Sequence, residues 1–317
     1  MHGVFLDLDS VHPGDLDLAP LREALDAWRF HGLTRPVDVA ARIRDAQVVV
    51  TNKARLDVTA LEAAPELQLV CVAATGTNNV DLETAADRGI VVSNARDYAT
   101  ASVVEHVFSL VLTLSRSLDR YRQRVTVGDW TRSAHFCVFD ETIEELAGKN
   151  LGIIGYGVLG RAVAAAARAF SMRVQIAQRL HDEALPGRVP FRELLESCDI
   201  VSLHCPLTEQ THGLIGEAEL RRMKPNALLI NAARGGIVDE VALVEALRRG
   251  WIGGAGVDVL AEEPPPASSP LLQYASPRLI VTPHVAWASR AARQRLLGEV
   301  TDNIRAFRDG HPRNRVV

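Results

Sequence analysis

The 317-residue sequence lacks an excess of positive charge, long apolar runs and clustered cysteines, each of which is typical of a particular class of protein. Its 35 Lys and Arg residues are outnumbered by 39 Asp and Glu residues, so no excess of positive charge is available to neutralise a phosphate backbone. No apolar run reaches the ~18 residues of a membrane span, and the first residues lack the basic and apolar segments of a secretory signal. We therefore expect no nucleic-acid partner, no membrane partner and a cytoplasmic location.

The cysteines are too few and too scattered for a disulfide framework or a structural zinc site. Cys71, Cys137, Cys198 and Cys205 form no CxxC pair. We expect them to be reduced and mostly buried thiols, and we expect no metal site.

The sequence does contain a regular alternation of short apolar runs with longer helical patterns. Hydrophobic residues make up 47% of the chain and charged residues 23%, which is ample for a dense core, and the length suggests roughly two domains. Such alternation predicts parallel sheets with crossover helices. Strands are expected within residues 3–8, 46–52, 67–74 and 90–94, and later within 150–157, 173–178, 199–206, 227–236, 252–260 and 278–287.

Helices are expected between these strands, and two of them are long. Residues 100–124 read as one helix whose apolar positions are too dense for a helix with one wet face, so it needs an additional packing surface. Residues 289–310 read as an amphipathic helix that ends at Gly310. Shorter helical patterns occupy residues 18–28, 58–66, 161–170, 192–197 and 241–250.

A glycine motif in the middle of the chain points to a cofactor. Gly155, Gly157 and Gly160 have the spacing G-x-G-x-x-G between an apolar strand and an alanine-rich helix that begins with Val158 and Leu159. In this context the first glycine permits a tight turn, the second lets the backbone approach a pyrophosphate, and the third lets the helix pack closely on the strand. The helix N-terminus offers N–H groups and partial positive charge to the phosphates. The motif therefore predicts a dinucleotide site.

The next expected strand ends in a neutral residue where an acidic one would favour NAD. Gln178 stands at that point and Arg179 follows it. A carboxylate there would accept hydrogen bonds from the ribose hydroxyls of NAD, whereas an amide does not repel a 2′-phosphate, which the guanidinium could bind. We expect NADP to be tolerated; the choice between NAD and NADP stays open, because Arg179 could equally point into solvent.

Three charged or titratable residues follow three successive expected strands. Arg234 comes after "ALLINAA", Glu263 after "AGVDVLAE" and His284 after "LIVTP". In a doubly wound sheet, the loops beyond the carboxyl ends of the strands line the ligand crevice. We therefore expect the three side chains to converge on one site beside the nicotinamide.

With the glycine loop, the segments around these residues resemble the D-isomer-specific 2-hydroxyacid dehydrogenase family over nearly the whole chain. They are "NAARGGIVDE", "GVDV" with "EEP", and "PHVA", in that order. The resemblance implies an α/β fold with two domains. A Rossmann-type doubly wound parallel sheet forms the NAD(P)-binding domain, residues 100–287, which is inserted into a smaller, flavodoxin-like α/β substrate domain, residues 1–99 and 288–317. It further implies a homodimer formed through the long helix. Because the chain would cross between the domains twice, near Ala99 and Ala288, we also expect the domains to close over the substrate.

The resemblance also implies a role for each catalytic residue. Arg234 binds the carboxylate and carbonyl of the substrate as a planar fork. His284 is the acid/base that protonates the carbonyl oxygen as hydride arrives, or removes the hydroxyl proton in the reverse direction. Glu263 pairs with His284, orients its ring and favours its protonated form.

Further positions match the binding contacts of the family. Thr75 and Gly76 match a loop of backbone amides that holds the substrate carboxylate, and Trp287 is expected near the site. Asn52 and Lys53 match a substrate-facing loop, although Lys53 could equally be a solvated turn residue. Cofactor contacts are expected at Gly155, Gly157, Val158, Leu159, Gly160, Gln178, Arg179, Cys205, Pro206, Thr211, Ala232, Ala233, Arg234, Asp258 and His284.

Within the family, "CVAATGTNNVD" and "PHVAW" are most similar to the glycerate dehydrogenases, also called hydroxypyruvate reductases. Formate dehydrogenases carry Gln where this chain has Glu263. We expect an NAD(P)-dependent oxidoreductase that interconverts hydroxypyruvate or glyoxylate with D-glycerate or glycolate. A reductase of the D-lactate or sugar-acid type stays open, and so does a cofactor-sensing, corepressor-like binding protein.

Overall fold

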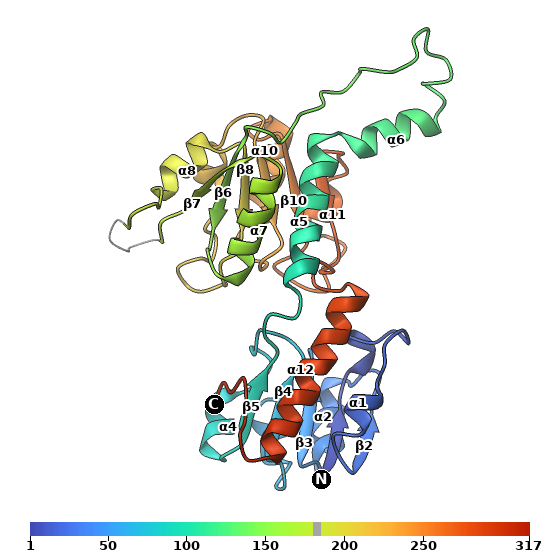
Figure 1. The fold of residues 1–317 in the computed structure, drawn as a ribbon, viewed down its shortest axis with the longest axis vertical. Coiled ribbons are helices and arrows are strands. Elements are labelled where there is room, and N and C mark those ends of the chain that lie inside the picture. Colours follow the sequence, from blue (N-terminus) through green and yellow to red (C-terminus); the bar gives the residue numbers. More distant parts are fainter. Residues whose placement is uncertain (180–184) are drawn as a thin grey trace. The chain divides into compact units, whose positions relative to one another are not determined.

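The structure, a computed structural model, describes residues 1–179 and 185–317 and divides into two compact units. The first unit consists of Met1–Ala99 and Trp287–Val317, and the second of Thr100–Ala286 (Figure 1). The chain returns to the first unit one residue earlier than the sequence predicted. The reason is that Trp287 packs edge-on against Tyr98, with 6.3 Å between the ring centroids.

The first unit is a five-stranded parallel sheet covered by helices. Its elements are β1 His2–Phe5, η1 Leu8–Ser10, α1 Ala19–Arg22, β2 Ala27–Phe30, η2 Pro36–Asp38, α2 Val39–Ile43, β3 Val48–Thr51, α3 Val58–Glu62, β4 Leu69–Val72, α4 Leu82–Asp87, β5 Val91–Asn94 and α12 Arg290–Arg308. The strand order β2-β1-β3-β4-β5 is the flavodoxin-like order. Strands β3 and β4 are buried at every residue, as expected for a parallel sheet with both faces covered.

Strand β2 begins at Ala27, inside the segment 18–28 that the sequence pattern predicted as a helix, so that prediction was wrong at the end of the segment. The helical pattern of residues 18–28 survives only as the single turn of α1. Trp28 and Phe30, two residues apart, instead lie on the same face of β2, and their ring centroids are 5.2 Å apart in a stacked arrangement. Parallel pairing with β1 therefore outweighs the local helical preference.

The second unit is a six-stranded parallel sheet whose strands all fall within the predicted segments. Its elements are α5 Thr100–Ser115, α6 Leu118–Thr126, β6 Asn150–Ile154, α7 Val158–Ala169, β7 Arg173–Ile176, α8 Phe191–Ser197, β8 Ile200–Leu203, α9 Glu217–Leu220, β9 Leu228–Asn231, α10 Glu240–Arg249, β10 Gly254–Val257, α11 Pro270–Gln273 and β11 Leu279–Val281. The strand order is β11-β10-β9-β8-β6-β7, and Ala177 bridges Val189 in parallel beyond β7. With that bridge as a minimal further strand, the order is that of a Rossmann fold.

The helix predicted over residues 100–124 is divided in two. Ser117 adopts a left-handed conformation (φ +50°) and separates α5 from α6. Helix α5 packs on α7, β9 and β10, which accounts for its dense apolar positions. Helix α6 and the loop after it project from the rest of this unit (Figure 1). This segment, residues 118–145, is called the arm below, and its exposed apolar side chains are Leu118, Val125, Val127, Trp130, Phe136, Phe139 and Ile143.

The described parts of the chain contain no helix that combines the length and apolar character needed to cross a membrane. They also contain no group of three His, Cys, Asp or Glu side chains able to hold a metal ion. The four cysteines are free thiols, and burial raises the pKa of Cys198 to about 11.

Candidate active site

The glycine loop between β6 and α7 is tight at its first and third glycines and open at its second. A Cβ at Gly155 (φ +93°) would lie 2.5 Å from the backbone nitrogen of Cys205, and one at Gly160 would lie 2.1 Å from the Gly155 carbonyl oxygen. At Gly157 a Cβ would meet nothing within 4 Å. Gly157 is also the N-cap of α7 and provides no side-chain cap, so the first N–H groups of the helix remain available to an anion. These residues therefore fit a dinucleotide pyrophosphate.

The loop after β8 borders the glycine loop and contains three of the predicted cofactor contacts. Thr211 Oγ1 donates to the Pro206 carbonyl oxygen at 2.7 Å and accepts from the Thr208 N–H at 2.7 Å, which fixes the turn. Burial raises the pKa of the Cys205 thiol. A protonated thiol suits a wall of the site rather than a nucleophile.

Two arginines lie around the end of β7. Gln178 closes this end by donating its N–H to the Val189 carbonyl oxygen at 2.8 Å, and Arg179 is exposed. Arg188 places its guanidinium 5.1 Å from the ring centre of Tyr156, the residue between the first two glycines of the loop. Positive charge is thus available on the side of the glycine loop where the sequence predicts the adenosine ribose.

His284 and Glu263 form a hydrogen-bonded pair. The Nδ1 of His284 lies 2.6 Å from one carboxylate oxygen of Glu263, and the Leu260 N–H donates to the other oxygen at 2.9 Å. Both side chains are about one-third exposed, at 29% and 32%. The pair therefore has a defined orientation and still faces solvent, as an acid/base that must reach a substrate requires.

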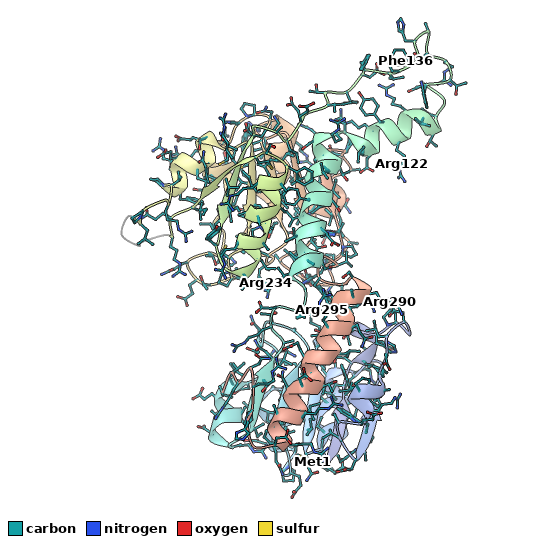
Figure 2. All side chains as sticks on the ribbon, viewed as in Figure 1. Met1, Arg122, Phe136, Arg234, Arg290 and Arg295 are labelled. Atoms are coloured by element: carbon teal, nitrogen blue, oxygen red, sulfur yellow. The ribbon has the colours of Figure 1, made fainter. Side chains whose placement is uncertain are left out.

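Arg234 follows β9 on a turn that packs tightly against the turn after β10. A Cβ at Gly235 would lie 1.8 Å from the Leu260 carbonyl oxygen, so only glycine fits there. Asn231, 1% exposed, accepts from the Ala233 N–H at 3.1 Å and donates to the Arg234 carbonyl oxygen at 3.0 Å. The Arg234 side chain is exposed at the opposite end of the second unit from Phe136 of the arm (Figure 2). The turns that carry Arg234 and Glu263 are therefore held against each other.

Asp258, a predicted cofactor contact, is buried and satisfied within the second unit. Its carboxylate is 1% exposed and accepts from the N–H groups of Val285 and Ala286 at 3.0 and 2.9 Å. It thereby fixes the loop that carries His284. Its contact with a nicotinamide stays a prediction, as do the contacts predicted for Ala232 and for Ala233, which is buried.

In the first unit, four of the predicted substrate residues lie on two loops that are tied together: Asn52 and Lys53 after β3, and Thr75 and Gly76 after β4. Asn79 donates its side-chain amide to the Asn52 and Ala54 carbonyl oxygens, at 3.4 and 3.1 Å, and so joins the loop after β3 to the loop after β4. The N–H groups of Thr75 and Gly76 make no hydrogen bond within the described parts of the chain. They are therefore free to bind an anion.

Asp7 is a buried residue of this region that the sequence did not mark. Its carboxylate accepts from the N–H groups of Asn52, Lys53 and Ala54, at 2.9, 2.6 and 2.8 Å. These three N–H groups are consequently unavailable to a ligand. Lys53 is exposed, and any contact it makes with a substrate must come from its ammonium group.

The family model described as D-isomer specific 2-hydroxyacid dehydrogenase, NAD binding domain, matches residues 108–286. The chain belongs to this family. It is 42% identical to a glycerate dehydrogenase from Methylorubrum extorquens, over 98% of this chain and 97% of that protein. It is 37% identical to a hydroxypyruvate reductase from Blautia hydrogenotrophica, over 98% of each.

Solved structures of the family share the fold of the whole chain. One is the NADPH-dependent glyoxylate/hydroxypyruvate reductase from Sinorhizobium meliloti in complex with NADP and malonate, with a TM-score of 0.83 and 29% identity. The match covers 100% of this chain and 96% of that one. Membership makes this chain a 2-hydroxyacid dehydrogenase, an oxidoreductase that acts on CH–OH groups with NAD(P).

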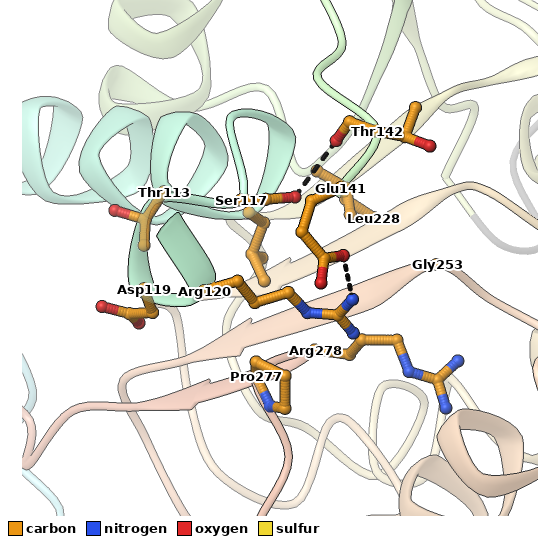
Figure 3. A pocket seen from close by; sticks show the side chains of 11 residues that line it. Thr113, Ser117, Asp119, Arg120, Glu141, Thr142, Leu228, Gly253, Pro277 and Arg278 are labelled. Atoms are coloured by element: carbon orange, nitrogen blue, oxygen red, sulfur yellow. Dashed lines mark hydrogen bonds and ion pairs between the residues drawn. The ribbon is translucent and has the colours of Figure 1, made fainter. Parts of the chain in front are cut away.

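The structure of this chain contains a pocket that lies away from the predicted active site. It is lined by residues at or just before the starts of β9, β10 and β11, including Leu228, Gly253 and Arg278, whereas the predicted catalytic residues follow the ends of these strands. Its other wall is the base of the arm, where Arg120 pairs with Glu141 and Ser117 donates to the Thr142 carbonyl oxygen at 3.1 Å (Figure 3). These contacts join the two chain segments at the base of the arm, residues 117–120 and residues 141–142.

Proposed function

We propose that this dehydrogenase reduces small 2-oxo acids, hydroxypyruvate or glyoxylate, to D-glycerate or glycolate, and oxidises these products in reverse. The observation that carries the proposal is the His284–Glu263 pair, which lies beyond the ends of β10 and β11 in a fold with an open dinucleotide loop. The activities named for the similar proteins from three organisms support this substrate class.

The pair explains how a proton can be delivered. Glu263 occupies Nδ1 of His284, which leaves Nε2 as the nitrogen for the substrate oxygen. The carboxylate also stabilises the positive charge of the imidazolium that must give up the proton. When bound, NAD(P)H would supply the hydride for the carbonyl carbon. His284 protonates the oxygen that gains negative charge as that hydride arrives.

We further propose that Arg234 and the two loops of the first unit bind the substrate carboxylate. Arg234 offers a planar fork of donors. The N–H groups of Thr75 and Gly76, which have no partner among the described residues, offer additional donors, and Lys53 adds a positive charge. Asn52 is buried and shapes its loop, and Trp287 is proposed as an aromatic wall that disfavours long side chains.

The test is a panel of 2-oxo acids with NADH and with NADPH, followed by the absorbance of the reduced cofactor. Hydroxypyruvate and glyoxylate should be reduced with higher kcat/KM than pyruvate. His284→Ala should lose almost all turnover and keep the Kd for NAD(P)H, because the imidazole acts on the substrate oxygen. A protein that bound cofactor but reduced none of the acids would favour the corepressor-like alternative, and wild-type rates in His284→Ala would refute the acid/base assignment.

We also propose that the chain forms a homodimer in the cytoplasm. The exposed apolar side chains of the arm support a second copy as the partner, because exposed apolar patches mark association sites. The four free thiols suit a reducing compartment.

A further inference from the structure

The loop that carries His284 has an uncommon backbone conformation. His284 has φ +55°, in the left-handed region that residues other than glycine rarely adopt. Its N–H donates to the carbonyl oxygens of Asp258 and Thr282, at 2.8 and 3.0 Å. Such a conformation persists only where the surrounding contacts hold it, so these contacts decide where the imidazole points.

One buried carboxylate holds the chain on both sides of His284. Oδ1 of Asp258 accepts from the Thr282 hydroxyl at 2.5 Å and from the Val285 N–H at 3.0 Å, and Oδ2 accepts from the Ala286 N–H at 2.9 Å. Thr282 precedes His284 by two residues, and the other two donors directly follow it. Displacement of this carboxylate would therefore release the whole loop.

A second histidine, on α5, contacts this carboxylate as well. Nε2 of His106 lies 2.9 Å from Thr282 Oγ1 and 3.4 Å from Oδ1 of Asp258, and its side chain is 18% exposed. The Thr282 hydroxyl has one proton and donates it to Asp258, so it can only accept from His106. Nε2 of His106 therefore carries a proton, which it donates to Thr282, with Asp258 as a second acceptor.

The charge of Asp258 makes these donors necessary. Burial raises the pKa of this carboxyl, but the hydrogen bonds from His106, Thr282 and the N–H groups of Ala286 and Val285 outweigh burial and hold the pKa below its usual value. The carboxylate is consequently ionised at neutral pH. A buried ionised group is stable in one position only while its hydrogen bonds are complete.

We propose that His106 is a positioning residue for the acid/base: through Thr282 and Asp258, its Nε2–H holds residues 282–286 in the conformation that presents His284 to the substrate. The inference rests on the proposed role of His284 and assigns His106 no contact with substrate. Ser102, one turn earlier on α5, donates to the Ala286 carbonyl oxygen at 2.7 Å, so the helix holds the loop at two points.

Five variants, four single and one double, test the proposal by their kcat, their KM for hydroxypyruvate and their Kd for NAD(P)H. His106→Leu removes the donor and should lower kcat about tenfold, with KM and Kd within about twofold of wild type. His106→Gln offers an amide N–H in place of Nε2–H and should restore most of kcat. Thr282→Val should behave like His106→Leu, while Thr282→Ser should behave like wild type. The His106→Leu, Thr282→Val double variant should be no worse than the poorer single variant, because both act through one carboxylate.

Wild-type kcat in His106→Leu, or equal losses in the Leu and Gln variants, would overturn the proposal. A large change in Kd for NAD(P)H would also overturn it and would assign His106 to cofactor binding. Hydrogen exchange of the Val285 and Ala286 amides adds a measurement that needs no turnover: exchange should be faster in His106→Leu and unchanged in His106→Gln. If wild type reduced no 2-oxo acid, the proposed function would fail, and the exchange rates would still decide whether His106 holds the loop.

Discussion

At the scale of single residues, Arg234 gives a direct test of how the substrate is bound. Lysine keeps the positive charge but replaces the planar fork of donors with a point charge. Arg234→Lys should therefore raise the KM for hydroxypyruvate at least tenfold and leave the Kd for NAD(P)H nearly unchanged, because the two-bond contact proposed for Arg234 is with the substrate carboxylate. Steady-state kinetics and a cofactor titration measure the two quantities. An unchanged KM would remove Arg234 from the substrate site.

His204 is a residue whose burial makes stability depend on pH. Burial lowers the pKa of His204 from 6.5 to about 4, and its Nδ1 has no hydrogen-bond partner within the described residues. Below pH 6.5 the unfolded chain binds a proton at this imidazole that the folded chain does not accept until about pH 4. The free energy of unfolding contributed by this group is therefore complete above pH 6.5 and is lost as the pH falls toward 4.

Denaturant titrations of the cofactor-free protein at pH 7 and pH 5 measure this effect. Between these values wild type should lose about 2 kcal/mol more stability than His204→Gln, in which the group cannot titrate. Glutamine can keep the hydrogen bond that joins His204 Nε2 to the Ser202 hydroxyl at 2.8 Å. The same pH dependence in both proteins would show that His204 is protonated without cost in the folded state.

At the scale of elements, the turns after β9 and β10 are packed so closely that a methyl group should separate them. Gly235→Ala would place a Cβ 1.8 Å from the Leu260 carbonyl oxygen, so one of the two turns must move. We expect a loss of about 2 kcal/mol or more of unfolding free energy and a large fall in kcat, because the turns carry Arg234 and Glu263.

Gly298 provides the matched control for this substitution. It lies within α12, and a Cβ there would meet nothing within 4 Å. Gly298→Ala should stabilise the protein by up to about 1 kcal/mol, since alanine is the better helix former. Thermal unfolding and kcat measured side by side test the pair, and a Gly235→Ala enzyme with wild-type stability and kcat would contradict the close packing of the turns.

The elements that the sequence predicted correctly are those whose signal is local. The strands of the second sheet lie in largely apolar runs, apart from β7 with its Arg173 and Gln175, and the three catalytic candidates were found because each follows such a run. Two features were missed for different reasons. Strand β2 exists because it pairs with β1, which the local sequence does not reveal. Ser117 breaks the long helix, and no proline or glycine marks the position of the break.

The site residues that the sequence did not mark also depend on long-range contacts. Asp7 binds the N–H groups of a loop 45 to 47 residues further along the chain, and His106 meets Thr282 across 176 residues. Neither belongs to a motif. Asn231 was not predicted either, and its only local sign in the sequence is that it is a polar residue at the end of an otherwise apolar strand.

At the scale of the whole molecule, the exposed apolar side chains of the arm give a test of the proposed homodimer. Phe136 and Phe139 are 90% and 81% exposed, which is costly for aromatic side chains unless a partner covers them. We expect wild type to sediment as a dimer at micromolar concentration and Phe136→Ser with Phe139→Ser to sediment as a monomer. The first unit supplies the control, because Leu33 and Val37 are comparably exposed, at 75% and 80%, but lie outside the arm.

Serine at Leu33 and Val37 should leave the dimer intact if association is specific to the arm. A wild-type monomer at micromolar concentration would refute the dimer, and a dimer that survives both aromatic substitutions would move the interface elsewhere. Since Arg234 lies at the opposite end of the second unit from Phe136, the monomeric variant should still bind NAD(P)H (Figure 2). Loss of cofactor binding together with the dimer would instead mean that the arm stabilises the fold of the second unit.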